Sequence, residues 1–312
     1  MQMSSVTSKS FSVLSYEVFK SKNATEPPTK TLVCLHGILG SKKNWRTPSN
    51  IFTKTHPEFI AVAMDHRGHG TSPATLPGAN TVASCAADVL RTLQSEDLPP
   101  VFREAPPTIL CGHSFSGKVI IDILDQLMKS NKPLPEHVWV LDSLPGTYDR
   151  DLDRSHKQSV VGIIDTICGL PAEFESKDWI EKHLVGKGFA RPIIDWLSTN
   201  IIPVHLPDGT LKEPRSFRYS FDGATVKCLF EDFCEKEVWT FLEHYRGNAT
   251  IHYIEAGKNA AWTDDVSKKM DEITTNNPRI KHHVMPHVGH WLHAEDVHGM
   301  LKIISENSGL TE

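Results

Sequence analysis

The 312-residue chain has no long apolar run, little net charge and few cysteines. No run approaches the ~18 apolar residues that a membrane-spanning helix needs. Residues 1–9 also lack the apolar core of a secretory signal. The formal net charge is only −5, and the chain has no block of like charge. Both features argue against a nucleic-acid partner or an electrostatically held membrane surface. With 39% hydrophobic residues, the chain can bury one large core, or one core and a smaller lid.

The six cysteines form neither a CxxC motif nor a closely spaced pair. Cys34 and Cys111 fall within apolar runs that predict buried strands, where a free thiol behaves as a small apolar side chain. We therefore expect all six thiols to be reduced, in an intracellular compartment. The Ser- and Thr-containing start of the chain fits a poor organellar transit peptide as well as a frayed tail, so cytoplasm and organelle both stay open. The sequence assigns no oligomeric state.

Strand-like and helix-like segments alternate over most of the chain. Short continuous apolar runs are typical of strands buried on both faces, and a first strand shows simple alternation. Helical patterns at 82–93 and 118–128 separate some of these strands. The alternation predicts a mostly parallel α/β sheet with helices on both faces and ligands at the carboxyl ends of the strands. The predicted strands cover residues 11–19, 31–35, 59–64, 108–111, 138–141, 250–255 and 280–285.

The strand pattern stops between residues 148 and 222. Segments 158–168 and 177–200 have helical periodicity instead. At about seventy residues the interruption is too long for one crossover connection, so we expect a helical lid that excludes water and shapes a substrate pocket. The predicted organisation is therefore an α/β core in two parts, residues 1–147 and 223–312, with the lid at 148–222.

The hexapeptide Gly112–Gly117 (GHSFSG) follows a predicted strand and directly precedes a predicted helix. This is the context of a nucleophile elbow, in which a sharp turn lifts a serine hydroxyl above the sheet edge. The G-x-S-x-G pattern has glycine where Ser116 stands, because strand and helix approach closely there. Serine is small enough to fit, so Ser114 is the candidate nucleophile. The alternative is a surface serine in an ordinary strand-to-helix turn.

Two other predicted strand ends supply partners for Ser114. The glycine-rich turn after residue 35 can present the backbone N–H of Ile38, which with the N–H of Phe115 would form a two-donor oxyanion hole. His290 lies in a Gly-His turn beyond the last strand, and we expect it to take the proton of Ser114. His287 is the fallback for this role.

The acid that would orient His290 has one preferred candidate. The usual place, the turn after residues 250–255, contains no carboxylate, and Asp264 and Asp265 look like the first turn of a helix. Asp142, at the end of the strand at 138–141, is therefore our choice, and Asn259 can add a hydrogen bond to the same network. The alternative reading of Asp142 is a turn aspartate that caps its own loop.

The histidines near His290 raise the alternative of a zinc site. They are His282, His283, His287 and His293. They mix strand, turn and helix positions, without an HExxH motif or a CxxC partner. We therefore expect no metal.

These motifs together resemble the α/β-hydrolase superfamily, and more narrowly the branch that contains the YbfF-type bacterial esterases and the alpha/beta-hydrolase domain 11 proteins. The segments that carry the resemblance are 36–45 (HGILGSKKNW), 65–72 (DHRGHGTS), the GHS elbow, 141–146 (LDSLPG) and 289–293 (GHWLH). The resemblance implies a serine esterase or lipase-type activity without a cofactor, and some eukaryotic members of the branch are mitochondrial. It also implies a rival acid, Asp222, at the end of an aromatic-Arg-x-x-apolar-Asp stretch after the lid.

We therefore predict a serine hydrolase that cleaves small to medium carboxylic esters through an acyl-enzyme intermediate. Its partner would be a small-molecule ester, with no nucleic acid. A catalytically silent receptor or scaffold of the same fold is one alternative. A carbon–carbon bond hydrolase or acyltransferase that uses the same three residues is another.

Overall fold

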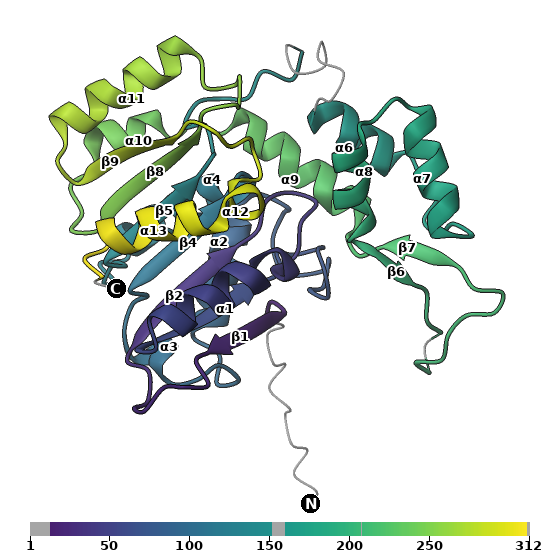
Figure 1. The fold of residues 1–312 in the computed structure, drawn as a ribbon, viewed down its shortest axis with the longest axis horizontal. Helices are drawn as coiled ribbons and strands as arrows, with labels where there is room; N and C mark the ends of the chain where they lie inside the picture. Colours follow the sequence, from purple (N-terminus) through teal and green to yellow (C-terminus); the bar gives the residue numbers. More distant parts are fainter. Residues whose placement is uncertain (1–12, 152–159, 207, 311–312) are drawn as a thin grey trace, which may run out of the picture.

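A seven-stranded sheet forms the centre of the computed structural model, which describes residues 13–151, 160–206 and 208–310 (Figure 1). The strand order is β1-β3-β2-β4-β5-β8-β9. β1 runs antiparallel to β3, and the other neighbouring pairs are parallel. The strands are β1 (Tyr16–Lys20), β2 (Lys30–Leu35), β3 (Phe59–Met64), β4 (Ile109–His113), β5 (His137–Leu141), β8 (Thr250–Ala256) and β9 (Ile280–Met285). The mostly parallel sheet is confirmed, although the first strand begins later than the expected 11–19 stretch, whose residues 11 and 12 lie outside the described chain.

Helices cover both faces of this sheet and create two apolar cores. Val33 and Leu35 belong to one core, whereas Leu32 and Cys34, on the opposite face of the same strand, belong to the other. Burial of both faces explains the continuous apolar runs in the sequence. The helices around the sheet are η1 (Lys42–Trp45), α1 (Arg46–Thr55), α2 (Val82–Leu93), α3 (Val101–Glu104), α4 (Phe115–Lys129), α9 (Gly223–Glu235), α10 (Trp239–His244), α11 (Asp264–Asn276), α12 (Leu292–Glu295) and α13 (Val297–Asn307).

A helical segment interrupts the sheet between β5 and β8 and lies beside the sheet (Figure 1). It contains α6 (Val160–Cys168), α7 (Lys177–Gly186), α8 (Arg191–Ser198) and an antiparallel pair of short strands, β6 (Ile201–Pro203) and β7 (Phe217–Tyr219). The expected helical stretch 177–200 is thus two helices, and residues 158 and 159 of the expected 158–168 stretch lie outside the described chain. The sequence analysis did not predict β6, β7 or α9. The two strands have three residues each, which is too short to show a period.

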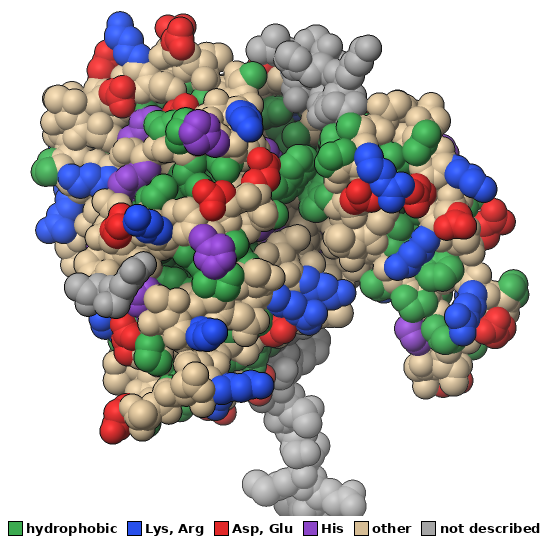
Figure 2. Space-filling model, in the orientation of Figure 1, with side chains coloured by type: hydrophobic (Ala, Val, Ile, Leu, Met, Phe, Trp, Pro, Cys, Tyr) green, Lys and Arg blue, Asp and Glu red, His purple; other side chains and the backbone are tan. Residues whose placement is uncertain are grey.

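Charged side chains of both signs are interspersed over the face of the molecule in Figure 2, on the sheet body and on the α6–α8 lobe alike. Among the residues that the structure describes, no helix combines the length and apolarity that a bilayer crossing requires.

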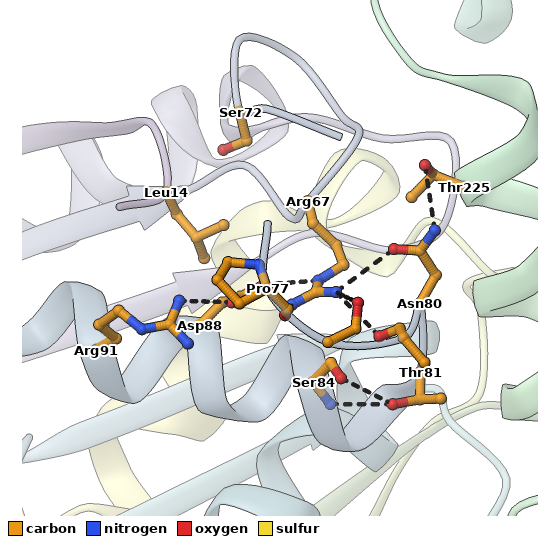
Figure 3. Close-up of polar contacts among 12 residues, drawn as sticks. Leu14, Arg67, Ser72, Pro77, Asn80, Thr81, Ser84, Asp88, Arg91 and Thr225 are labelled. Atoms are coloured by element: carbon orange, nitrogen blue, oxygen red, sulfur yellow. Dashed lines mark hydrogen bonds and ion pairs between the residues drawn. The ribbon is translucent and has the colours of Figure 1, made fainter. Parts of the chain in front are cut away.

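A buried arginine fastens the loop after β3 to α2 (Figure 3). Arg67 has no exposed surface, and its Nε lies 2.7 Å from Oδ2 of Asp88, which is also buried. Its Nη atoms donate to the carbonyls of Pro77 and Ala79, at 3.0 and 2.9 Å. A buried charge is tolerated only when it is paired and its donors are satisfied. The loop between β3 and α2 is consequently held around a single side chain.

Removing the carboxylate partner of this arginine should destabilise the fold strongly. Asp88→Ala leaves Arg67 charged and buried, so we expect the free energy of unfolding to fall by about 3–5 kcal/mol in urea titrations. Glu17→Ala, which removes the exposed partner of Arg46, is the matched control and should cost less than ~1 kcal/mol. Equal small losses in both variants would contradict the role of Arg67.

Candidate active site

The strand-to-helix turn after β4 places Ser114 at the carboxyl edge of the sheet. Ser114 has a positive φ of 54° and stands at the N-cap of α4, yet its hydroxyl makes no capping bond. The turn is tight because a Cβ at Gly112 would lie 2.6 Å from the carbonyl oxygen of Ser116. A Cβ at Gly117 would lie 2.3 Å from the Cβ of Ser143. Only glycine permits these approaches, so the sharp elbow follows from the two flanking glycines.

Ser116, the residue that departs from the G-x-S-x-G pattern, is fully buried and hydrogen-bonded. Its hydroxyl donates to the carbonyl of His36 at 2.5 Å and accepts from Nε2 of His66 at 2.6 Å. Burial lowers the pKa of His66 well below its ordinary value, which keeps that imidazole neutral. Serine at this position therefore ties the elbow to the ends of β2 and β3.

His290 connects Ser114 to a carboxylate across three strand ends. Its Nε2 lies 3.0 Å from Oγ of Ser114, and its Nδ1 lies 2.5 Å from Oδ2 of Asp142. Asp142 follows β5, has a φ of 46° and is 2% exposed. The carboxylate can only accept, so the ring proton sits on Nδ1 and the Nε2 lone pair is free to take the proton of the serine. This arrangement can activate a serine hydroxyl as a nucleophile.

The carboxylate of Asp142 accepts hydrogen bonds from four donors in the described part of the chain. Oδ1 accepts from the backbone N–H of Ala256 at 3.1 Å and from Nε1 of Trp262 at 2.7 Å. Oδ2 accepts from Nδ2 of Asn259 at 2.8 Å, in addition to His290. A carboxylate has about four lone-pair positions, so this one is satisfied and held in one orientation. Sequence reasoning anticipated Asn259 but missed Trp262, whose only signal is its place in the turn after β8 that lacks a carboxylate.

The rival acid and the fallback histidine take no part in this geometry. The Asp222 carboxylate caps α9, accepting from the backbone N–H of Thr225 at 2.7 Å. The imidazole bonded to Ser114 is that of His290, whereas His287 is exposed. Asp264 and Asp265 form the first turn of α11, as expected.

The turn after β2 lies against the nucleophile. A Cβ at Gly37 would be 3.1 Å from the Cβ of Ser114. The backbone N–H groups of Ile38 and Phe115 have no acceptor within the described parts of the chain, although both residues are buried. Buried N–H groups are nearly always paired, so two such donors beside a serine are suited to a developing oxyanion.

A second layer of histidines lies behind His290. Nε2 of His113 donates to the carbonyl of His290 at 2.7 Å, and the rings of His113 and His293 are 4.5 Å apart. His293 in turn stacks on Trp45, with ring centroids 5.6 Å apart. Burial lowers the pKa of His113 well below its ordinary value and that of His293 to about 4. Both rings are therefore neutral near pH 7 and add no positive charge behind His290.

Other histidines of the described chain lie in separate parts of the fold or pair across neighbouring strands. Across the described ranges, no three His, Cys, Asp or Glu side chains are grouped so that they could hold an ion. His283 instead pairs with Nδ1 of His252 at 3.2 Å, across neighbouring strands.

Comparisons with known proteins agree with this architecture. The model of the alpha/beta hydrolase family matches residues 32–301. The chain is 23% identical to the sn-1-specific diacylglycerol lipase ABHD11 of Xenopus tropicalis, over 93% of this chain and 80% of that protein. It is 24% identical to protein phosphatase methylesterase 1 of Neurospora crassa, over 83% of this chain and 60% of that protein. A solved marine microorganism esterase superposes with a TM-score of 0.70 at 20% identity, covering 95% of this chain and 99% of that one.

The depressed pKa of His293 should make the fold sensitive to acid. The folded pKa of about 4 lies below the ordinary 6.5, so the unfolded chain binds the proton first as the pH falls. Stability is therefore full above about pH 6.5 and declines toward pH 4. His293→Phe keeps an aromatic ring at this position but cannot titrate. We expect its free energy of unfolding to fall by about 3 kcal/mol less than that of the wild type over this pH range.

Urea titrations at several pH values between 7 and 4 measure this difference. The exposed His298 provides the control, because His298→Gln should follow the wild-type curve. A His293→Phe variant with the wild-type pH dependence would refute the assignment.

Proposed function

This chain belongs to the alpha/beta hydrolase family, and we propose that it is a serine hydrolase that cleaves small to medium carboxylic esters through an acyl-enzyme intermediate. The observation that carries the proposal is the single imidazole of His290, bonded to Ser114 on one side and to Asp142 on the other. No cofactor is needed for this chemistry, because nucleophile, base and acid all come from the chain.

The proposed reaction begins when Nε2 of His290 takes the proton of Ser114 and Oγ attacks the ester carbonyl carbon. The oxyanion that forms accepts hydrogen bonds from the N–H groups of Ile38 and Phe115, and loss of one such donor commonly costs ~10²–10³ in rate. The alcohol then leaves with the proton from His290. In the second half, His290 takes a proton from water, the water oxygen attacks the acyl-serine, and Ser114 leaves with the proton returned by His290. Asp142 holds the imidazole in the reactive tautomer and stabilises the imidazolium.

Two kinds of observation support an ester as the substrate. The names of the relatives, a diacylglycerol lipase and a methylesterase, both describe ester hydrolysis. In addition, the backbone N–H groups of the buried residues Ile38 and Phe115, which have no acceptor within the described parts of the chain, suit the tetrahedral intermediate of acyl transfer.

We also propose that residues 148–222 act as a lid on a core formed by 1–147 and 223–312. Support comes from an aromatic contact between the two parts, in which the rings of Trp196 on α8 and Trp291 lie 5.5 Å apart. Trp291 directly follows His290, so a movement of α8 would also displace His290, the proposed general base.

Removal of the nucleophile tests the proposal most directly. Ser114→Ala should not be labelled by a fluorophosphonate probe, and kcat/KM on p-nitrophenyl esters should fall by ~10⁵-fold or more. Labelling is read by mass spectrometry and hydrolysis by absorbance. A folded wild-type protein that is neither labelled nor active on a broad ester panel would instead favour a silent binding protein.

Paired substitutions distinguish the two candidate acids. Asp142→Asn should lower kcat by about 10⁴-fold. The amide of asparagine can donate a hydrogen bond to Nδ1 of His290, which puts the ring proton on Nε2, so that Nε2 can no longer accept the proton of Ser114. Asp222→Asn should leave kcat within about threefold of the wild type and the melting temperature unchanged, because asparagine caps a helix as well as aspartate does. The opposite pattern in steady-state kinetics would assign the acid to Asp222.

A further inference from the structure

The turn after β2 contains a buried non-glycine residue in the left-handed region. Leu39 has a φ of 61° and no exposed surface. It occupies the third position of a four-residue turn closed by the N–H of Gly40 and the carbonyl of Gly37, at 3.0 Å. A positive φ at that position normally calls for glycine or asparagine. A leucine there persists only where surrounding groups hold the backbone in place.

Hydrogen bonds from outside the turn hold three successive peptide groups of it. The carbonyl of Gly37 accepts from Nδ1 of His36 at 2.7 Å. The N–H of Leu39 donates to Nε2 of His69 at 3.2 Å, and burial lowers the pKa of His69 to about 3, so this nitrogen keeps its lone pair. The carbonyl of Leu39 accepts from Nδ2 of Asn200 at 2.8 Å.

Asn200 comes from the proposed lid, 161 residues along the chain from Leu39. It is 2% exposed and lies between α8 and β6. Its own backbone is fixed, because its N–H donates to the carbonyl of Leu197 at 3.1 Å and its carbonyl accepts from the N–H of Ser220 at 2.8 Å. A carbonyl can only accept, so the amide nitrogen of Asn200 must be the atom that faces Leu39.

The N–H of Ile38 shares a planar peptide unit with the carbonyl of Gly37, so its direction follows that of the turn. Once Asn200 no longer holds Leu39, the backbone of the turn can relax toward negative φ. The peptide groups before Leu39 would rotate with it, and the N–H of Ile38 would no longer point toward the oxyanion.

We propose that Asn200 is a positioning residue that latches the lid to the turn at residues 37–40 and keeps the N–H of Ile38 directed at the oxyanion. This inference rests on the proposed function. Removal of Asn200 should therefore weaken the stabilisation of the transition state and change substrate binding in the ground state little, because the oxyanion exists only after attack.

Asn200→Asp provides the test, because it keeps the shape of the side chain but loses the donor and turns an oxygen toward the carbonyl of Leu39. We expect kcat on p-nitrophenyl esters to fall about 10-fold or more, with KM within about threefold of the wild type. The affinity for a trifluoromethyl ketone, which forms an oxyanion on Ser114, should fall by a similar factor. Each kcat is expressed per Ser114 that a fluorophosphonate labels at its end point, so that unfolded protein is not counted.

Thr199→Ala is the matched control, since among the described residues the Thr199 hydroxyl bonds only to the carbonyl of Trp196, within the same helix end. It should keep the wild-type kcat and inhibitor affinity. Asn200→Ala repeats the test without a charge if the aspartate variant does not fold. Failure of both variants to fold would make Asn200 a purely structural residue and overturn the proposal.

A wild-type kcat in a folded Asn200→Asp or Asn200→Ala variant would also overturn the latch, as would an increase in KM alone. Neither result touches the proposed function, which Ser114→Ala tests separately. Ester hydrolysis that persists in Ser114→Ala, or is absent from the wild type, would overturn the proposed function and the latch together.

Discussion

The buried carboxylate of Asp142 joins three segments of the chain at the carboxyl edge of the sheet. It lies at the end of β5 and binds the end of β8, the turn beyond β8 and the loop after β9. A carboxylate buried to this degree is costly unless its oxygens are hydrogen-bonded, so the four donors are a condition for folding as well as for orientation. The position of His290, and through it the hydrogen bond to Ser114, depends on this interaction.

The opposite side of Ser114 is organised by the buried ion pair of Arg67 with Asp88 and by imidazoles that burial keeps neutral. Arg67 holds the loop after β3 against α2, and His69 in that loop accepts from Leu39 in the turn after β2. Asn200 closes the same turn from the proposed lid. The two sides meet at the elbow, where Ser116 bonds to the end of β2 while His113 bonds to the loop of His290. Ser114 therefore stands between two networks of hydrogen bonds.

Most of the sheet could be predicted because burial on both faces leaves a local mark. Strands such as β2 and β3 are continuous apolar runs, and α2 lies at the residues where its helical period predicted it. The elbow was visible for a similar reason, since strand, small residues and helix follow each other directly. The short strands β6 and β7 left no such mark, because three residues are too few to show a period. The same limit applied to Trp262 and Asn200, each of which contacts a residue more than a hundred positions away.

The sequence by itself determined the fold class, the serine on the elbow and the short list of acids and bases that follow the strands. Those properties are local, because they arise from side-chain periodicity and from small residues in consecutive positions. The sequence favoured His290 and Asp142 but left His287 and Asp222 as alternatives, and only the tertiary structure shows that His290 contacts both Ser114 and Asp142. The tertiary structure also placed the lid asparagine on the turn beside the nucleophile. Hydrogen bonds between distant segments require donor and acceptor to be placed to within a few tenths of an ångström. Only the packing of the strands against one another sets that placement.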